Sequence, residues 1–416
     1  MTDPPESYAG IDWAGTEHQA FLLDTRGEPL GERRIAHSGP GLTELCDWLV
    51  ARTGLAPERI AVAIETCHGP VVEALLERGF RVFAVNPKQL DRFRDRFSVA
   101  GAKDDRRDAR VLAASLRTDP ACFRALAPEE PLVLELREWS RIAEELRRER
   151  TRLGNRLYQQ LWRYYPQMLA LGDDVGAPWR LALWELAPTP ERVRRLRHGT
   201  VEALLKRHRI RRLDAEGVLG RLRQPALRVA PGTAEAAQAH IRQLIARLRL
   251  VQRQLAEAEA RLDTLCSALA DGEAEPGQPG EQHDVTILRS VPGVGRIVLA
   301  MLLAEAGEAL RRRDYHALRT RCGVAPVTRR SGKQCVVHIR WACSRRLREA
   351  VYHWARVACQ HDPACRCRYQ ALRARGHSHA RALRTVGDRL IALACTLLRR
   401  RELFDPQRAA AQPAPA

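Results

Sequence analysis

The feature that most limits the fold of this chain is a short apolar run, RIAVAI, at residues 59–64. An uninterrupted run of this length is typical of a strand that is buried on both faces of a sheet. A helical pattern follows at residues 70–78 and stops at Gly79, and a second strand pattern, RVFAVNP, occupies residues 81–87. Strand, helix and strand in this order predict an α/β layer fold.

A hairpin pattern precedes this unit. Residues 8–30 read as two strands around a short turn, residues 32–35 could add a third strand, and residues 41–52 have helical periodicity. Antiparallel strands joined to a strand–helix–strand unit give a mixed sheet. We therefore predict an α/β domain over residues 1–128.

Four acidic residues lie at positions where an α/β fold commonly binds ligands. Asp12 lies near the end of the first strand, and Glu65 directly follows the apolar run. Asp105 and Asp108 are three residues apart at the start of a helical pattern, so they share one helical face. Carboxylates at strand ends face the crevice in which open α/β sheets bind ligands. We predict that these acids hold two Mg²⁺ ions, a site suited to phosphoryl transfer.

Each acid also has a plain structural alternative. Asp105 and Asp108 could form a solvated first helical turn, where acids favour the helix dipole. Asp12 could cap a turn, and Glu65 could pair with a nearby arginine. Asp104 is an extra acid, which would take the place of Asp105 if the helix began in a different register.

The charge of the chain indicates a polyanionic partner. The 416 residues carry a net charge of +19, mostly from arginine, which favours bidentate contacts to phosphate. Residues 286–405 hold 25 Lys and Arg against 8 Asp and Glu, a net charge of +17. Nucleic acid is the expected partner, and a membrane surface is the competing one. The latter would need lipid-facing helices with aromatic anchors, which are not evident.

Targeting and redox features agree with a cytoplasmic, nucleoid-associated protein. No stretch of roughly 18 apolar residues is present, and the first residues, MTDPPESYAG, lack the basic and apolar parts of a signal peptide. The 11 cysteines contain no CxxC pair, so we expect reduced thiols.

Residues 129–275 are predicted to form a helical, coiled-coil middle region. Two long helical patterns, at residues 132–169 and 234–270, could pair as an antiparallel coiled coil, dimerise, or form a simple intramolecular bundle. Pro166 ends or kinks the first pattern. Three aromatic residues close to arginines could stack on nucleobases or could simply be packed in the protein: Trp162, Tyr164 and Tyr165.

Residues 276–403 are predicted to form a mainly α-helical domain, followed by a disordered tail at 404–416. A PGVG turn precedes an apolar helix at its start and could present backbone N–H groups to a phosphate. Further on, Ser331 is expected in a loop between cations, as a turn serine or as a reactive one. The residues predicted to contact nucleic acid are Lys103, Gly293, Gly295, Arg329, Arg330, Gly332 and Lys333.

Three stretches together resemble a known family: IETCHG, VFAVNPKQLDRFRDRFSVAGAKDDRRDARVLA, and CGVAPVTRRSGKQCVVHIRWACSRRLREAVYHWA. They are similar to the DEDD, RuvC-like insertion-sequence transposases, the bridge-RNA-guided serine-dependent DNA recombinases. The resemblance covers most of the chain. Residues 66–69 (TCHG) depart from the Glu-Ala-Thr-Gly loop of many members.

The resemblance implies a ribonuclease-H/RuvC-like first domain with Asp12, Glu65, Asp105 and Asp108 as its catalytic tetrad. It also implies that Ser331 is the nucleophile of a C-terminal transposase domain and forms a phosphoserine with DNA. The implied partners are the double-stranded DNA of element ends and target, a non-coding guide RNA, and further copies of the chain as a dimer or tetramer. Two other functions stay open: a metal-dependent Holliday-junction-type endonuclease without a covalent intermediate, and a nucleic-acid-binding protein without catalysis.

Overall fold

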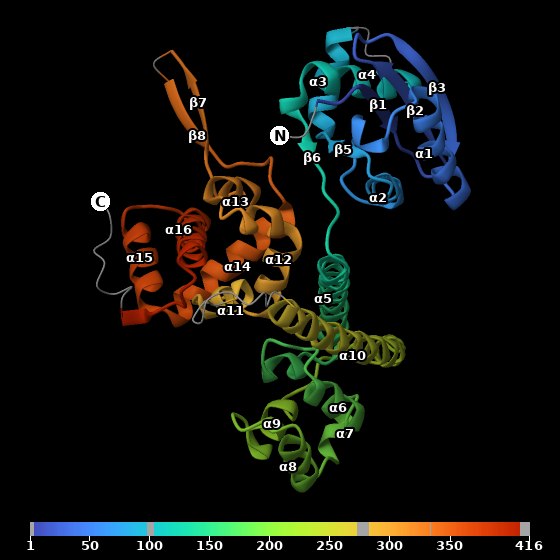
Figure 1. The fold of residues 1–416 in the computed structure, drawn as a ribbon. Helices are drawn as coiled ribbons and strands as arrows, with labels where there is room; N and C mark the ends of the chain where they lie inside the picture. The colour runs from blue at the N-terminus through green and yellow to red at the C-terminus, as the bar shows by residue number, and fades with distance from the viewer. Residues whose placement is uncertain (1–3, 98–103, 273–282, 333, 408–416) are drawn as a thin grey trace. The chain divides into compact units, whose positions relative to one another are not determined.

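The computed structural model describes residues 4–97, 104–272, 283–332 and 334–407. The chain divides into two compact units, residues 1–130 and 131–416, which are described separately below (Figure 1). Lys103 and Lys333, two of the predicted nucleic-acid contacts, lie outside the described residues. The predicted tail also lies outside them from residue 408 onward.

The first unit is built on a six-stranded mixed sheet in the order β3-β2-β1-β4-β5-β6. Its strands are β1 (Ser7–Asp12), β2 (Glu17–Asp24), β3 (Pro29–Ala36), β4 (Ile60–Ile64), β5 (Arg81–Ala84) and β6 (Arg124–Ala125). Its helices are α1 (Gly39–Thr53), α2 (Pro70–Glu77), α3 (Pro87–Phe97) and α4 (Asp105–Thr118), with short 3-10 turns η1 (Pro57–Arg59) and η2 (Pro120–Cys122). The predicted α/β domain with a mixed sheet is confirmed.

Strand β4 is the centre of this unit, and all five of its residues are buried. It runs parallel to both β1 and β5. Its residues alternate between two cores: Ile60, Val62 and Ile64 pack with residues of α1 and α2, whereas Ala61 and Ala63 pack with residues of α4. The apolar run in the sequence is therefore a strand covered by helices on both faces.

Helix α4 lies directly against β1, and Gly10 is the residue that permits this approach. A Cβ atom added at Gly10 would stand 2.0 Å from the backbone oxygen of Ala109 and 2.5 Å from the backbone nitrogen of Ala113. Since side chains alternate along a strand, Asp12 points to the same face as Gly10, towards α4. The contact thus brings the acids of α4 to the end of β1.

We expect Gly10→Ala to destabilise the first unit by about 1–3 kcal/mol or more, because its methyl group would displace the backbone of α4. The loss is measurable as a lower urea midpoint. Gly15→Ala is the matched control, since a Cβ atom there meets nothing within 4 Å. An equally stable Gly10→Ala protein would contradict the close packing of α4 on β1.

The second unit is mainly helical, as predicted for the middle and C-terminal regions. Its middle helices are α5 (Pro131–Tyr164), α6 (Pro178–Leu186), α7 (Pro190–Arg194), α8 (His198–Arg207), α9 (Ala215–Leu222) and α10 (Thr233–Gly272), with a 3-10 segment η3 (Pro166–Leu171). The remaining elements are α11 (Asp284–Ser290), α12 (Arg296–Arg311), α13 (Tyr315–Arg321), β7 (Val327–Ser331), β8 (Gln334–His338), α14 (Arg345–His361), α15 (Pro363–Ala374) and α16 (His379–Arg400).

Helices α5 and α10 pair side by side within one chain. Arg261 contacts Glu135 at 2.6 Å and Arg247 lies 3.7 Å from Glu149, so α10 runs antiparallel to α5. The pair joins two hydrophobic cores. One core combines the first half of α5 with α12, α14 and α16, and the other combines its second half with η3 and α6–α9. No helix in the described ranges is both long and apolar enough to cross a membrane.

Candidate active site

Two of the predicted acids lie at neighbouring strand ends. Asp12 is the last residue of β1, and Glu65 directly follows β4. The parallel register places Ile11 opposite Ile64, so the two acids come next along adjacent strands. Both are partly exposed. Their predicted positions are confirmed, and their catalytic role stays a prediction.

The other two acids lie on the first turns of α4, whose register is set by Asp104. The Asp104 carboxylate accepts a hydrogen bond from the backbone N–H of Arg106 at 3.4 Å, so Asp104 is the N-cap and the helix begins at Asp105. Asp105 is exposed and Asp108 is fully buried. The register that would exchange Asp104 for Asp105 is therefore not adopted, and Asp104 has a capping function of its own.

The buried Asp108 is paired with an arginine that the sequence did not single out. Arg94 of α3 donates from Nε to Asp108 Oδ1 at 2.6 Å and from Nη2 to Oδ2 at 2.8 Å. Its Nη1 pairs with Asp91. Hydrogen bonding to Asp108 is the main cause that raises the pKa of Arg94, and Asp91 and Glu65 raise it further. A buried carboxylate needs such a partner, because an unpaired charge in the interior is strongly unfavourable.

The four carboxylates supply the oxygen donors that Mg²⁺ prefers. In the described residues, however, no three Asp, Glu, His or Cys side chains stand close enough together to hold a metal ion. Both oxygens of Asp108 are engaged by Arg94. The chemistry of the four carboxylates suits the ion, whereas their arrangement in the described residues does not bring three of them together.

The loop after Asp12 is held by a histidine pair. The backbone N–H of Ala14 donates to Nδ1 of His18 at 3.3 Å, so neutral His18 carries its proton on Nε2 and donates to Nδ1 of His37 at 2.9 Å. His18 is 1% exposed. Burial, and then the neighbouring His37, lower the pKa of His18.

This pair predicts a loss of stability in acid. The folded state takes up the His18 proton at a lower pH than the unfolded state does, so the unfolded state binds more protons between the two pKa values. Stability should therefore fall as the pH drops from about 6.5, the unfolded value, to the lowered folded pKa, and then level off. Urea midpoints across pH 5–8 test this. His18→Asn, whose amide oxygen can still accept from Ala14, should remove that part of the pH dependence, and an unchanged profile in this variant would exclude His18 as its source.

The predicted nucleophile lies on a strand and not in a loop. Ser331 is the last residue of β7 and pairs with Gln334 of β8. Gly332, with a φ of +54°, occupies the left-handed conformation that favours glycine. The expected loop was wrong because VTRRS lacks the alternating apolar residues that mark a half-buried strand. Ser331 is exposed at the end of this hairpin.

The hairpin separates the two predicted arginines. Because side chains alternate along β7, Arg329 lies on the same face as Ser331, and Arg330 lies on the opposite face. Both side chains are exposed, and neither forms an ion pair within the described residues. A phosphate bound at Ser331 would therefore meet Arg329 first.

The PGVG turn combines a packed glycine with an open helix end. Gly293 has a φ of +81°, and a Cβ atom there would stand 2.7 Å from the backbone nitrogen of Ala358 in α14. Trp354 also donates to the carbonyl of Pro292 at 2.8 Å. Gly295 is exposed at the N-cap of α12. Packing against α14 thus explains why glycine stands at position 293. No side chain caps the first turn of α12 after Gly295, so the phosphate contact predicted for its backbone N–H groups stays a prediction.

The structure locates two cationic surfaces within regions that the sequence marked as basic. Helix α15, the residue that follows it and helix α16 carry arginines that form no ion pair within the described residues: Arg368, Arg375, Arg384 and Arg389. Burial is the main cause that lowers the pKa of Arg368, and the proximity of Arg389 and Arg375 lowers it further. Like charges gathered without an acid are typical of a phosphate-binding surface.

The second surface lies on α5. Tyr164 and Tyr165 are buried, so the packed alternative holds for them, whereas Trp162 is 64% exposed. Tyr158, one helical turn earlier, is 48% exposed. Three exposed arginines on this part of the helix form no ion pair among the described residues: Arg152, Arg156 and Arg163. Aromatic rings beside guanidinium groups that form no ion pair are suited to single-stranded nucleic acid.

A charge count by region would have indicated this second surface. Residues 151–250 contain 19 Lys and Arg against 8 Asp and Glu, a net charge of +11. Residues 1–130 contain 17 against 21, a net charge of −4. The unit with the acids is thus negative, and the cationic regions belong to the other unit.

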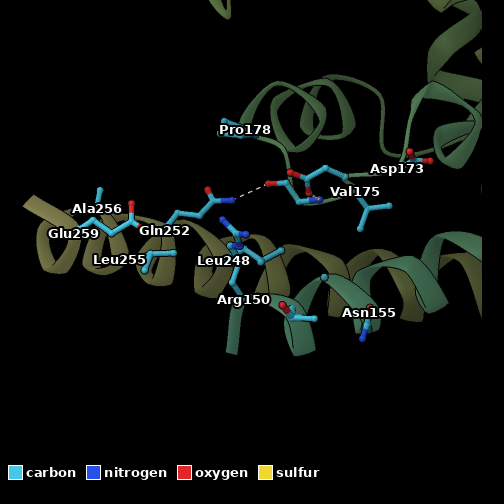
Figure 2. A pocket seen from close by; sticks show the side chains of 14 residues that line it. Arg150, Asn155, Asp173, Val175, Pro178, Leu248, Gln252, Leu255, Ala256 and Glu259 are labelled. Carbon is cyan, nitrogen blue, oxygen red and sulfur yellow. Dashed lines mark hydrogen bonds between the residues drawn. The ribbon is translucent and has the colours of Figure 1, made fainter. Parts of the chain in front are cut away.

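A cavity of about 470 Å³ lies between α5, α10 and the loop that precedes α6 (Figure 2). Gln252 of α10 donates to the carbonyl of Gly176 at 2.7 Å across it, and the backbone N–H of Gly176 is bonded to Asp174 at 3.0 Å. None of the predicted site residues lines this cavity. Its polar contacts hold the loop on the helix pair.

Comparison with known proteins agrees with these features. A family model described as a transposase, of the DEDD type of IS110, matches residues 9–166, and a model of the IS116/IS110/IS902 transposase family matches residues 285–370. The first match contains all four acids, and the second contains the hairpin with Ser331.

Relatives of known source extend the match over nearly the whole chain. The protein y4uE of Sinorhizobium fredii is 59% identical over 216 residues, 52% of this chain and 60% of that protein. The IS117 mini-circle protein of Streptomyces coelicolor is 33% identical over 411 residues, 97% of this chain and 96% of that protein. The IS116 insertion-element protein of Streptomyces clavuligerus is 27% identical over 407 residues, 96% of each chain. This chain therefore belongs to the IS110/IS116/IS902 family of transposases, enzymes that cut DNA and transfer its strands.

Proposed function

We propose that this transposase cuts and rejoins DNA through a covalent phosphoserine at Ser331. The observation that carries the proposal is the hairpin: Ser331 stands exposed at its end, on one face with the unpaired Arg329. A serine hydroxyl needs a cationic setting to attack a phosphate, because its alkoxide and the charge on the phosphoryl oxygens must be stabilised.

The chemistry is reversible without an energy source. As the Ser331 Oγ–P bond forms, the P–O bond to the departing strand breaks. The serine proton is passed through water to the oxygen of the departing strand, which leaves with a hydroxyl end. In the second half, the hydroxyl end of the incoming strand attacks the phosphoserine and releases the serine. One phosphodiester is lost and one is formed, so the number of ester bonds is conserved.

Asp12, Glu65, Asp105 and Asp108 are proposed as the acids that act on the scissile phosphate, in a domain of the RuvC-like type. The sheet order supports this, as does the convergence of β1, β4 and α4 on one edge. When bound, Mg²⁺ would neutralise charge that develops on the phosphate. The chain's own contribution is to hold these acids at strand ends and to keep Asp108 buried until it is used.

Nucleic acid is proposed to bind mainly to the second unit. Its hairpin, the arginines of α15 and α16, and the exposed face of α5 are cationic, whereas the first unit is net negative. The stacking surface at Tyr158 and Trp162 supports a single-stranded partner, such as a non-coding guide RNA. Assembly as a dimer or tetramer, with Ser331 of one copy acting beside the acids of another, is part of the same proposal.

A cleavage assay on DNA from the ends of the element tests the proposal. The full chain is incubated with labelled DNA and Mg²⁺, and the products are denatured and separated. A labelled band at the size of protein plus DNA supports the phosphoserine. Cleavage without this band would favour the junction-type endonuclease. Binding that weakens with salt, without cleavage at any ion concentration, would favour a non-catalytic protein.

A further inference from the structure

Arg94 occupies the position of a cation at the proposed metal site. Its guanidinium binds both oxygens of Asp108, at 2.6 and 2.8 Å, while the Asp108 side chain is 1% exposed and that of Arg94 is 18% exposed. Glu65 also acts on this guanidinium. One of the four acids proposed to hold a divalent ion, Asp108, is thus already paired within the chain.

An arginine and a divalent ion cannot share Asp108 without repulsion. A charge-assisted bidentate pair uses both carboxylate oxygens, and a second cation at the same group would meet a positive charge at close range in a poorly screened interior. Binding of the ion and release of Arg94 are therefore linked events.

The helix that carries Arg94 is fixed, so the side chain has to move. Leu90 of α3 is fully buried, and Phe93 stacks on Phe123 with ring centroids 5.8 Å apart and an angle of 9° between the planes. The alternative partner is already in place, because Arg94 Nη1 pairs with Asp91 one helical turn away. The Asp91 side chain is 67% exposed, so a guanidinium that turns towards it also gains solvent.

We propose that Arg94 is a positioning residue that holds Asp108 in the absence of metal and gives it up to a divalent cation by turning to Asp91. The proposal rests on the proposed function only in that Asp108 is an ion ligand. It assigns a role to two residues outside the tetrad. It also predicts that two neighbouring substitutions change ion affinity in opposite directions.

Calorimetric titration of the full chain with Mn²⁺ tests this without any measurement of cleavage. Arg94→Gln keeps a hydrogen-bond donor for Asp108 but removes the competing charge, and it should tighten Mn²⁺ binding about tenfold, the equivalent of ~1.4 kcal/mol. Asp91→Asn removes the alternative partner and should weaken binding. In the double variant, Asp91→Asn should lose most of its effect, because that effect acts through Arg94.

Arg96→Gln is the matched control on the same helix. Arg96 pairs with Asp119 at 2.6 Å, outside the acid cluster, so its variant should bind Mn²⁺ as the wild type does. A folded Arg94→Gln protein that binds Mn²⁺ no more tightly than the wild type overturns the proposal and leaves Arg94 as a structural partner of Asp108. If the glutamine variant does not fold, Arg94→Lys replaces it, since a lysine makes a single-point contact and should also tighten binding.

Failure of the metal site itself gives a different result. Glu65→Gln should weaken Mn²⁺ binding in the wild type and in the Arg94→Gln background alike. If it changes neither titration, the ion does not bind at these acids, and the metal part of the proposed function fails independently of Arg94.

Discussion

Ser331→Ala is expected to abolish the protein–DNA adduct and to lower strand exchange by at least ~10³-fold, the scale of effect found when a catalytic nucleophile is removed. The physical reason is that alanine offers no oxygen to form the phosphate ester, whereas the exposed position of Ser331 at the end of β7 makes the change harmless to packing. The measurement is the labelled band that survives denaturation, together with the rate of joined product.

Ser344→Ala is the control for this experiment. Ser344 caps α14 by accepting a hydrogen bond from the backbone N–H of Leu347 at 3.4 Å. Its loss should cost about 1 kcal/mol of stability and leave the adduct intact. An adduct that persists in Ser331→Ala and disappears in Ser344→Ala would move the nucleophile to Ser344.

Asp105→Asn is expected to lower cleavage by about 100-fold or more, beyond the 10–100-fold that the loss of an outer partner of a metal ligand brings. Asp105 is exposed in the first turn of α4, so its neutralisation removes one charge from the acid site and should leave the fold intact. The rate of DNA cleavage at saturating Mg²⁺ measures the effect.

Asp104→Asn provides a control one residue away. Asparagine caps a helix as well as aspartate does, so this variant should retain both its stability and its cleavage rate within about twofold. If Asp104→Asn removes activity and Asp105→Asn does not, Asp104 is the active acid and the role that the helix register gives to Asp105 is wrong.

The parts of the fold that the sequence predicted are those with a local pattern. The uninterrupted apolar sequence of β4 indicates a buried strand, and the helices of the middle region show an apolar stripe with a proline after the end of α5. Asp12 and Glu65 were placed correctly for the same reason, since each follows a strand whose end is visible in the sequence. The α5–α10 pair was one of three arrangements that the stripes allowed, and only the structure selects it.

The remaining features depend on contacts between distant positions. Arg94 and Asp108 are 14 residues apart, and only the packing of α3 beside α4 brings them together. Tyr164, Tyr165 and Trp162 have similar neighbours in the sequence, yet the helix buries the first two and exposes the third. The hairpin was missed because none of the residues of β8 is buried, so no alternation between an apolar and a polar face marks it.

The exposure of this hairpin has a consequence for the fidelity of the enzyme. A two-stranded ribbon without a packed face is only marginally ordered, and fixing its backbone costs about 1–2 kcal/mol per residue. A DNA of matching sequence that contacts the hairpin can offset this free-energy cost. A mismatched DNA that binds only to the other cationic surfaces cannot. Matched and mismatched DNA would then be distinguished after binding, at the step that brings the serine into position. Such an induced fit would prevent cleavage at sites to which the protein binds only transiently.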